Sequence, residues 1–196
     1  MKTRHLLAAG TAVFAFIVLS GQTAPAAAPV PPPAAARVRL SPHETISLKV
    51  DGNRVTVTYG RPYSKDPKTG DIRKIWGSLV PYGKVWRTGA DEATLFLTQQ
   101  AVDLGATTIP AGAYTLFTVV AADGSAKLLV NRQVGQWGVD PYDEKQELAR
   151  IDLKKDALAA PLDQFTMGLE KDPAGGGVLK LAWESTQYSV PFAVKK

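Results

Sequence analysis

Cysteine is absent from this 196-residue chain, and several kinds of chemistry are absent with it. Disulfide bonds, thiolate zinc sites and cysteine nucleophiles are all excluded. Histidine is almost as scarce, because His5 and His43 are the two histidines of the whole sequence. The sequence therefore has too few histidines for a histidine-based zinc site, and a Ser-His-Asp triad is not expected either. We expect neither a metal nor a cofactor.

Charge and glycine patterning exclude two further classes of protein. The formal net charge is +5, but the lysines and arginines are scattered among acidic residues and form no basic stripe. Binding to nucleic acid is therefore not expected. No glycine-rich loop leads into a helix, so the pattern of a phosphate-binding loop is missing too. Residues 66–71, DPKTGD, superficially resemble a calcium loop but lack alternating ligands and a closing glutamate, so we predict a hairpin turn there.

The first residues of the chain have the pattern of an export signal. A positively charged start is followed by an apolar run from Leu6 to Leu19 and then by small residues. This run is shorter than the roughly 20 apolar residues of a membrane span. We therefore predict a cleaved signal peptide over residues 1–26 and a periplasmic or secreted protein with no membrane span after cleavage. An uncleaved leader would instead act as a membrane anchor.

The rest of the chain reads as a linker followed by one β domain. Residues 27–36 are almost entirely alanine and proline, and we expect an extended linker there, before a single domain over residues 37–196. Apolar residues of this domain alternate with a period of two, and Asp51-Gly52 separates two such runs in the manner of a hairpin turn. The pattern predicts about ten short strands in an all-β fold, a single antiparallel β-sandwich of the Greek-key or jelly-roll kind. The clearest expected strands are residues 45–50, 54–59, 94–99, 113–120, 126–131, 148–154, 162–170, 178–184 and 187–194.

Several segments of the domain resemble a known family. The most specific is PYGKVWRTGADEATLFL at 81–97, and the others are GRPYSK (60–65), KIWGSLVPYG (74–83), IPAGAYTLFTV (109–119), NRQVGQWG (131–138) and LAWESTQYSVPF (181–192). Together they resemble the domain-of-unknown-function 2911 family over roughly residues 40–194. The resemblance implies an exported bacterial protein, and it supplies no catalytic roles because the family has no established activity. The family often has asparagine where this chain has Asp91, which argues against an obligatory carboxylate at that position.

The segment around Arg87 is the strongest candidate for a site. Arg87 could bind an anion or a carboxylate in a bidentate manner, and Trp86 could stack on a ligand. Glu92 could accept a proton or orient the guanidinium, and Asp91 lies beside it. The interpretation we favour is that Arg87 pairs internally with Asp91 or Glu92 while Trp86 packs in the core. The two acids do not form a glycosidase pair, because neighbours on an extended chain point to opposite faces.

Three further residues are candidates for ligand binding. Trp76 and Trp137 lie in glycine-flanked loops, where indoles suit partly exposed sites. Arg61 lies at a predicted strand end and is the most plausible second cation. The alternatives are that the two indoles close the ends of the sandwich and that Arg61 is a solvated charge. Trp183 lies in an alternating strand and is expected in the core.

The sequence alone leaves three functions open. The first is a non-catalytic domain of the cell envelope that binds a small ligand or acts as a scaffold, with an unknown small molecule or envelope component as its partner. The second is a hydrolase or isomerase that uses carboxylate and arginine groups only, and the third is a purely structural envelope protein. A single concave pocket would favour a ligand, and dispersal would favour a structural role. The residues that this test compares are Arg61, Trp76, Arg87, Glu92 and Trp137.

Overall fold

The computed structural model describes residues 40–196. The predicted signal peptide (1–26), the linker (27–36) and the start of the domain at residue 37 lie outside these residues and stay predictions. Within the described part of the chain, no helix is long and apolar enough to cross a membrane.

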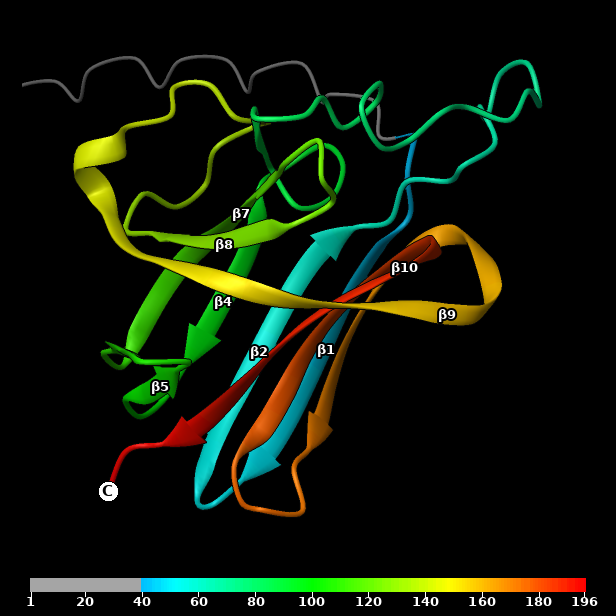
Figure 1. Ribbon diagram of the computed structural model, residues 1–196. Helices are drawn as coiled ribbons and strands as arrows, with labels where there is room; N and C mark the ends of the chain where they lie inside the picture. The colour runs from blue at the N-terminus through cyan, green and yellow to red at the C-terminus, as the bar shows by residue number, and fades with distance from the viewer. Residues whose placement is uncertain (1–39) are drawn as a thin grey trace, which may run out of the picture. The chain divides into compact units, whose positions relative to one another are not determined.

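The described residues form the expected all-β fold with about ten strands, which is confirmed (Figure 1). The one helical element among them is the single 3₁₀ turn η1, at Glu144–Gln146. The strands are β1 (His43–Val50), β2 (Asn53–Gly60), β3 (Val85–Trp86), β4 (Thr94–Thr98), β5 (Val102–Leu104), β6 (Thr107–Ile109), β7 (Gly112–Val120), β8 (Ala126–Asn131), β9 (Glu147–Lys171) and β10 (Gly177–Val194).

All ten strands belong to one antiparallel sheet that does not close into a barrel. The order is β1-β2-β4-β7-β8-β9-β10-β5-β6, and β3 pairs with β7 beside this path. The long strand β9 connects two sections, because its first part pairs with β8 and the remainder pairs with β10. In Figure 1 this strand crosses the view from the side of β8 to the side of β10.

The first hairpin follows from its sequence as predicted. Val50 pairs with Asn53, and the two turn residues between them, Asp51 and Gly52, have φ angles of 48° and 77°. Both angles lie in the left-handed region that a type I′ turn needs, which aspartate and glycine tolerate. The alternation of side chains is also as expected, since Val55 and Val57 of β2 are fully buried.

The two longest strands differ from the sequence prediction. The sequence predicts separate strands at 148–154 and 162–170, but both are parts of the continuous strand β9. The separate strands predicted at 178–184 and 187–194 are likewise parts of β10. The register explains the difference, because Ala157 and Leu162 pair with Thr186 and Glu184 while the residues between them have no partner in β10. This irregular stretch contains a proline, which cannot donate to a ladder. The short strands β3, β5 and β6 are not among the predicted ones.

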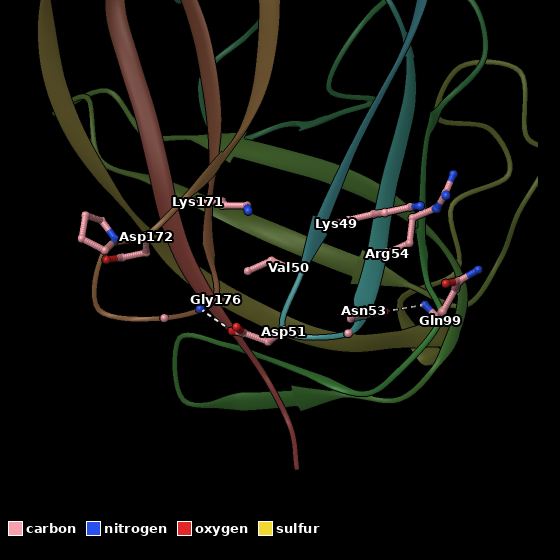
Figure 2. Close-up of a pocket in the computed structure, with 12 residues that line it drawn as sticks. Lys49, Val50, Asp51, Asn53, Arg54, Gln99, Lys171, Asp172 and Gly176 are labelled. Carbon is pink, nitrogen blue, oxygen red and sulfur yellow. Dashed lines mark hydrogen bonds between the residues drawn. The ribbon is translucent and has the colours of Figure 1, made fainter.

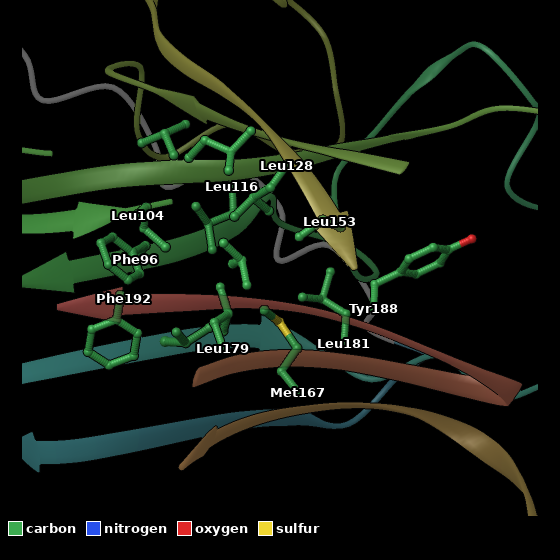
Figure 3. Close-up of a cluster of buried hydrophobic side chains, with 14 of the residues drawn as sticks. Phe96, Leu104, Leu116, Leu128, Leu153, Met167, Leu179, Leu181, Tyr188 and Phe192 are labelled. Atoms are coloured by element: carbon green, nitrogen blue, oxygen red, sulfur yellow. The ribbon is translucent and has the colours of Figure 1, made fainter. Parts of the chain in front are cut away.

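The core lies between the two sections of the sheet. Figure 3 shows side chains of β4, β7 and β8, among them Phe96, Leu116 and Leu128, opposite Met167 of β9 and Leu181 of β10. Each of these five residues is at most 2% exposed. Burial of apolar surface on this scale is the main favourable contribution to folding in a domain without disulfides.

Candidate functional site

The segment that the sequence singles out forms a tightly held loop between β3 and β4. Thr88 is fully buried and has a φ of 55°, which is unusual for a β-branched residue. Its hydroxyl lies 2.8 Å from the hydroxyl of Thr118 on β7, and its carbonyl accepts a 2.7 Å hydrogen bond from the Thr94 hydroxyl. These contacts hold a backbone conformation that costs about 1–3 kcal/mol, and such strain is concentrated at functional sites.

Two glycines allow this loop to pack directly on the end of β2. A Cβ atom at Gly60 would lie 2.2 Å from the carbonyl oxygen of Ala90, and one at Gly89 would lie 2.8 Å from the carbonyl oxygen of Gly60. The backbone N–H of Ala90 donates to the Gly60 carbonyl at 3.3 Å. Glycine at both positions is therefore what permits the close approach that places the loop.

A cavity of about 440 Å³ opens beside this loop. The loop supplies one wall, the segment that follows β2 supplies a second, and β10 contributes a tryptophan. Its volume suits a molecule of metabolite size. The lining residues that matter for its chemistry are Tyr63, Arg73, Trp86, Arg87, Asp91 and Trp183.

The aromatic wall of the cavity is fixed by its own contacts. The rings of Trp86 and Trp183 are stacked, with centroids 6.0 Å apart and an interplanar angle of 21°. The indole N–H of Trp86 donates to the Gly89 carbonyl at 3.1 Å, and that of Trp183 donates to the Asp163 carbonyl at 3.2 Å. Trp183 is 1% exposed, which agrees with its predicted place in the core. The wall is thus formed before any ligand arrives.

Three polar atoms of the cavity residues are buried without a hydrogen-bond partner among residues 40–196. They are the Nε atoms of Arg73 and Arg87 and the Oδ2 atom of Asp91. The internal ion pair predicted for Arg87 is therefore wrong for the described residues, since neither Asp91 nor Glu92 lies within 4.0 Å ion-pair distance of its guanidinium. Buried polar groups in native proteins nearly always have a partner, so these three atoms require an explanation.

The remaining charges of the cavity belong to the turn after β2. The carboxylate of Asp66 accepts the backbone N–H of Lys68 at 2.8 Å, and this hydrogen bond lowers the pKa of Asp66. The predicted hairpin turn at 66–71 is present, because the Gly70 N–H donates to the Asp66 carbonyl at 2.8 Å. Asp66 is therefore ionised, and its carboxylate is already engaged by the backbone of its own turn. The side chain of Arg73 donates a hydrogen bond to the Tyr63 carbonyl, and Arg73 also lines the cavity.

The other sequence candidates lie outside the cavity. Arg61 joins β1 to β9, because one Nη lies 3.3 Å from the Glu44 carboxylate and the other donates to the Thr166 hydroxyl at 3.0 Å. Trp76 packs edge-on against Trp86, with ring centroids 6.3 Å apart. These contacts give Arg61 and Trp76 structural partners rather than a place at the cavity.

Glu92 and Trp137 are partners of each other, and Glu92 also contacts the first strand. Their backbones form an isolated antiparallel bridge, and the Glu92 carboxylate lies 2.7 Å from the imidazole Nε2 of His43. Of the five residues compared in the pocket test, Arg87 alone lines this cavity. The structure thus brings together Trp86, Arg87 and Asp91 and disperses the other four. By the comparison set out from the sequence, this dispersal favours a structural role for Arg61, Trp76, Glu92 and Trp137, and a ligand-binding role for any of the seven stays a prediction.

A larger cavity, of about 760 Å³, lies at the other end of β1 and β2. Figure 2 shows that it lies where the β1–β2 turn meets the β9–β10 turn, and the Asp51 carboxylate accepts the Gly176 N–H there at 2.8 Å. Its cations Lys49, Arg54 and Lys171 are exposed side chains. None of the seven candidate residues lines it, so the cavity beside Arg87 is the better candidate site.

Sequence reasoning missed Tyr63 and Arg73 as lining residues. Both lie near a segment whose sequence predicts only a turn, and an arginine within a short polar loop gives little signal by itself. Within the described part of the chain, no three histidine, aspartate or glutamate residues are grouped in a way that could hold a metal ion. The charged and aromatic groups of the cavity are therefore the guanidinium groups of two arginines, the ammonium group of Lys68, the carboxylates of Asp66 and Asp91, and aromatic rings.

Comparison with known proteins identifies a family. A family model described as a protein of unknown function, DUF2911, matches residues 41–192. A search of curated proteins and a search of solved structures give no significant match. The resemblance carried by the segments around Trp86 and Arg87 is thus confirmed. Because the match covers most of the chain, the protein belongs to the DUF2911 family.

Proposed function

We propose that the protein binds a small organic anion in the cavity beside Arg87 and that it does so as an exported protein. The observation that carries the proposal is Arg87, which lines a preformed cavity and whose guanidinium has no ion-pair partner among residues 40–196. A bound carboxylate or phosphate would supply that partner through charge-assisted hydrogen bonds.

Two further features of the cavity support an organic ligand over an inorganic ion. Arg73 lines the same cavity, so a second guanidinium group borders it. The apolar surfaces of Trp86, Val85 and Val139 line the same cavity, which suits a ligand with a carbon skeleton. We propose binding rather than catalysis, because Asp66, one of the two carboxylates that line the cavity, is already engaged by the backbone of its own turn.

Export is the second part of the proposal. It is supported by the charged start, the apolar run and the small residues of the first 26 positions. N-terminal sequencing of the protein recovered from the periplasm or the medium tests it, and a chain that begins between residues 23 and 28 is the expected result. A chain that still begins with Met1 in a membrane fraction would contradict it.

The binding site is tested by thermal shift with a panel of small carboxylates, sugar acids and phosphate esters. A ligand that binds only the folded protein raises the melting temperature as its concentration increases. We expect at least one class of anion to raise it in the wild-type protein and to lose this effect in Arg87→Gln. Arg132→Gln is the matched control, because Arg132 is exposed and lines neither cavity. A panel without any response, or equal responses in both variants, would overturn the proposal.

A further inference from the structure

The mouth of the cavity beside Arg87 is lined by apolar side chains that solvent reaches. Leu40 and Leu79 both line this cavity, and they are 53% and 42% exposed. Pro67 and Pro81 line it too and are also exposed. We call these four residues the apolar rim. Single exposed apolar side chains are common on proteins, but several around one cavity indicate a surface that a ligand or partner covers.

Leu79 belongs to a turn whose base is anchored in the core. Ile75 and Val80 of this turn are fully buried, and the Val80 N–H donates to the Ile75 carbonyl at 2.9 Å. The Leu79 N–H itself donates to the Lys74 carbonyl at 3.2 Å. The backbone of the turn is therefore fixed, and Val80 rather than Leu79 is the residue that enters the core. The exposure of Leu79 at the cavity is thus a property of the fold.

The indole of Trp86, by contrast, already has three aromatic partners within the protein. It is stacked with Trp183 at a centroid distance of 6.0 Å, and the rings of Phe165 and Trp76 meet it edge-on at 5.1 and 6.3 Å. A ligand ring would have to share this indole with three side chains, whereas the apolar rim offers aliphatic surface that is open to solvent. The cavity therefore suits an aliphatic carbon chain better than an aromatic ring.

We infer that the ligand is a free amphiphilic anion, an unbranched aliphatic carboxylate of the fatty-acid class. The cations that line the cavity, Lys68, Arg73 and Arg87, would attract its carboxylate, and its chain would cover the apolar rim. The volume of about 440 Å³ is in the range of sites for single small molecules, which favours a free molecule over a partner protein. The inference rests on the proposed function for the anionic end and adds to it the aliphatic chain.

The first experiment is isothermal titration calorimetry of the wild-type protein with butanoate, hexanoate, octanoate and decanoate, each below its micelle concentration. We expect the affinity to rise about fourfold with each added methylene that covers the apolar rim, which is the usual effect of burying one CH₂ group. The rise should level off once the chain extends beyond the rim. Octan-1-ol is the matched neutral ligand and should bind at least about tenfold more weakly than octanoate, because it lacks the charge that the arginines attract.

The second experiment changes the protein instead of the ligand. Leu79→Ala removes apolar surface from the rim and leaves the charged groups of the cavity in place. We expect a loss of about tenfold in affinity for octanoate and almost none for butanoate, so the dependence of affinity on chain length becomes weaker. A disturbed fold would instead weaken the binding of both ligands. Leu97→Ala is the matched control, because Leu97 is 38% exposed and lines neither cavity.

The outcomes separate this inference from the proposed function. If the carboxylates bind with no dependence on chain length and lose affinity in Arg87→Gln, the anion site stands and the fatty-acid class is overturned. The result is the same if none of the four carboxylates binds while another organic anion does. If octan-1-ol binds as tightly as octanoate and Arg87→Gln weakens neither, the proposed anion site itself fails. Equal losses in Leu79→Ala and Leu97→Ala would overturn the role of the apolar rim.

A last arm distinguishes a free ligand from a membrane surface, which also presents anionic groups and aliphatic chains. The wild-type protein is sedimented with phosphatidylglycerol vesicles, and we expect it to stay in solution. Sedimentation with the vesicles that is lost in Leu79→Ala, without binding of any free carboxylate, would identify the membrane as the partner of the apolar rim and would overturn the inference.

Discussion

The hydroxyl of Tyr59 joins the end of β2 to the backbone of Met167 in β9. It accepts the backbone N–H of Met167 at 2.9 Å and donates to the Glu44 carboxylate at 2.7 Å. The Tyr59 ring is 1% exposed and packs edge-on against Phe165, with centroids 5.8 Å apart. Because β2 and β9 are not neighbours in the sheet order, this contact ties together the two sections between which the core lies.

Removal of this hydroxyl is expected to destabilise the protein. In Tyr59→Phe the ring remains, but the buried N–H of Met167 loses its acceptor. We predict a loss of about 1–3 kcal/mol in the free energy of unfolding, the usual cost of a buried polar group left without a partner. Chemical denaturation measures it, with Tyr63→Phe, in the loop after β2, as the matched control. A loss within about 0.5 kcal/mol would show that the hydroxyl has no such role.

Buried tyrosine hydroxyls such as that of Tyr59 are expected to make the free energy of unfolding depend on pH in the alkaline range. Burial raises the pKa of Tyr188 from 10.0 to about 12, and burial also raises the pKa values of Tyr59 and Tyr142. The folded protein therefore holds these protons more tightly than the unfolded chain. Their contribution is fully present below pH ~10 and is lost as the pH rises from there toward ~12.

The prediction is tested with Tyr188→Phe. In the wild-type protein the Tyr188 hydroxyl donates to the Gly124 carbonyl at 2.9 Å, and the variant lacks this hydroxyl. Free energies of unfolding are measured along an alkaline pH series for the wild-type protein and the variant. Lysine side chains titrate in both proteins over this pH range. The difference between the two slopes of unfolding free energy against pH therefore reports the titration of the Tyr188 phenol alone. We expect a shallower decline in the variant, and parallel curves would contradict the assignment.

How far the sequence could predict the fold depends on how local each signal is. The β1–β2 hairpin is specified by adjacent residues, since Asp51 and Gly52 form its turn and the flanking residues alternate. The continuity of β9 could not be predicted in this way. It depends on pairing first with β8 and then with β10, and the unpaired stretch before Leu162 ends in Pro161, which cannot donate to a ladder.

The candidate site could be predicted only in part for a similar reason. Trp86, Arg87 and Asp91 are close in sequence, so a local motif identifies them together. Arg73 and Trp183 come to the cavity from the segment after β2 and from β10, and no local pattern connects them to Arg87. That Arg87 and Asp91 form no ion pair was also beyond the sequence, because the direction of a side chain depends on the folded backbone, and Asp91 has a φ of 62° in this loop.

A methyl group at Gly60 is expected to disturb the site loop. The added Cβ would lie 2.2 Å from the Ala90 carbonyl oxygen, and this neighbour is backbone, so the loop itself must move. We predict that Gly60→Ala lowers the free energy of unfolding by about 1–3 kcal/mol, as overpacking usually does, and weakens binding at the cavity. Gly168→Ala is the matched control, because its Cβ would meet nothing closer than 3.8 Å. Equal stability of the two variants would show that the close approach is unimportant.

Replacement of Arg87 separates a binding role from a structural one. Arg87→Leu removes a guanidinium whose Nε is buried without a partner, so its loss leaves no described carboxylate unpaired. We predict a free energy of unfolding that stays within about 0.5 kcal/mol of the wild-type value or rises, as is common when a functional group is removed. Arg61→Leu is the matched control and should lose about 1–3 kcal/mol, because Arg61 contacts Glu44 and Thr166. Denaturation of both variants provides the comparison. A loss above about 3 kcal/mol in Arg87→Leu would indicate a buried internal ion pair and would remove the basis for an anion site beside Arg87.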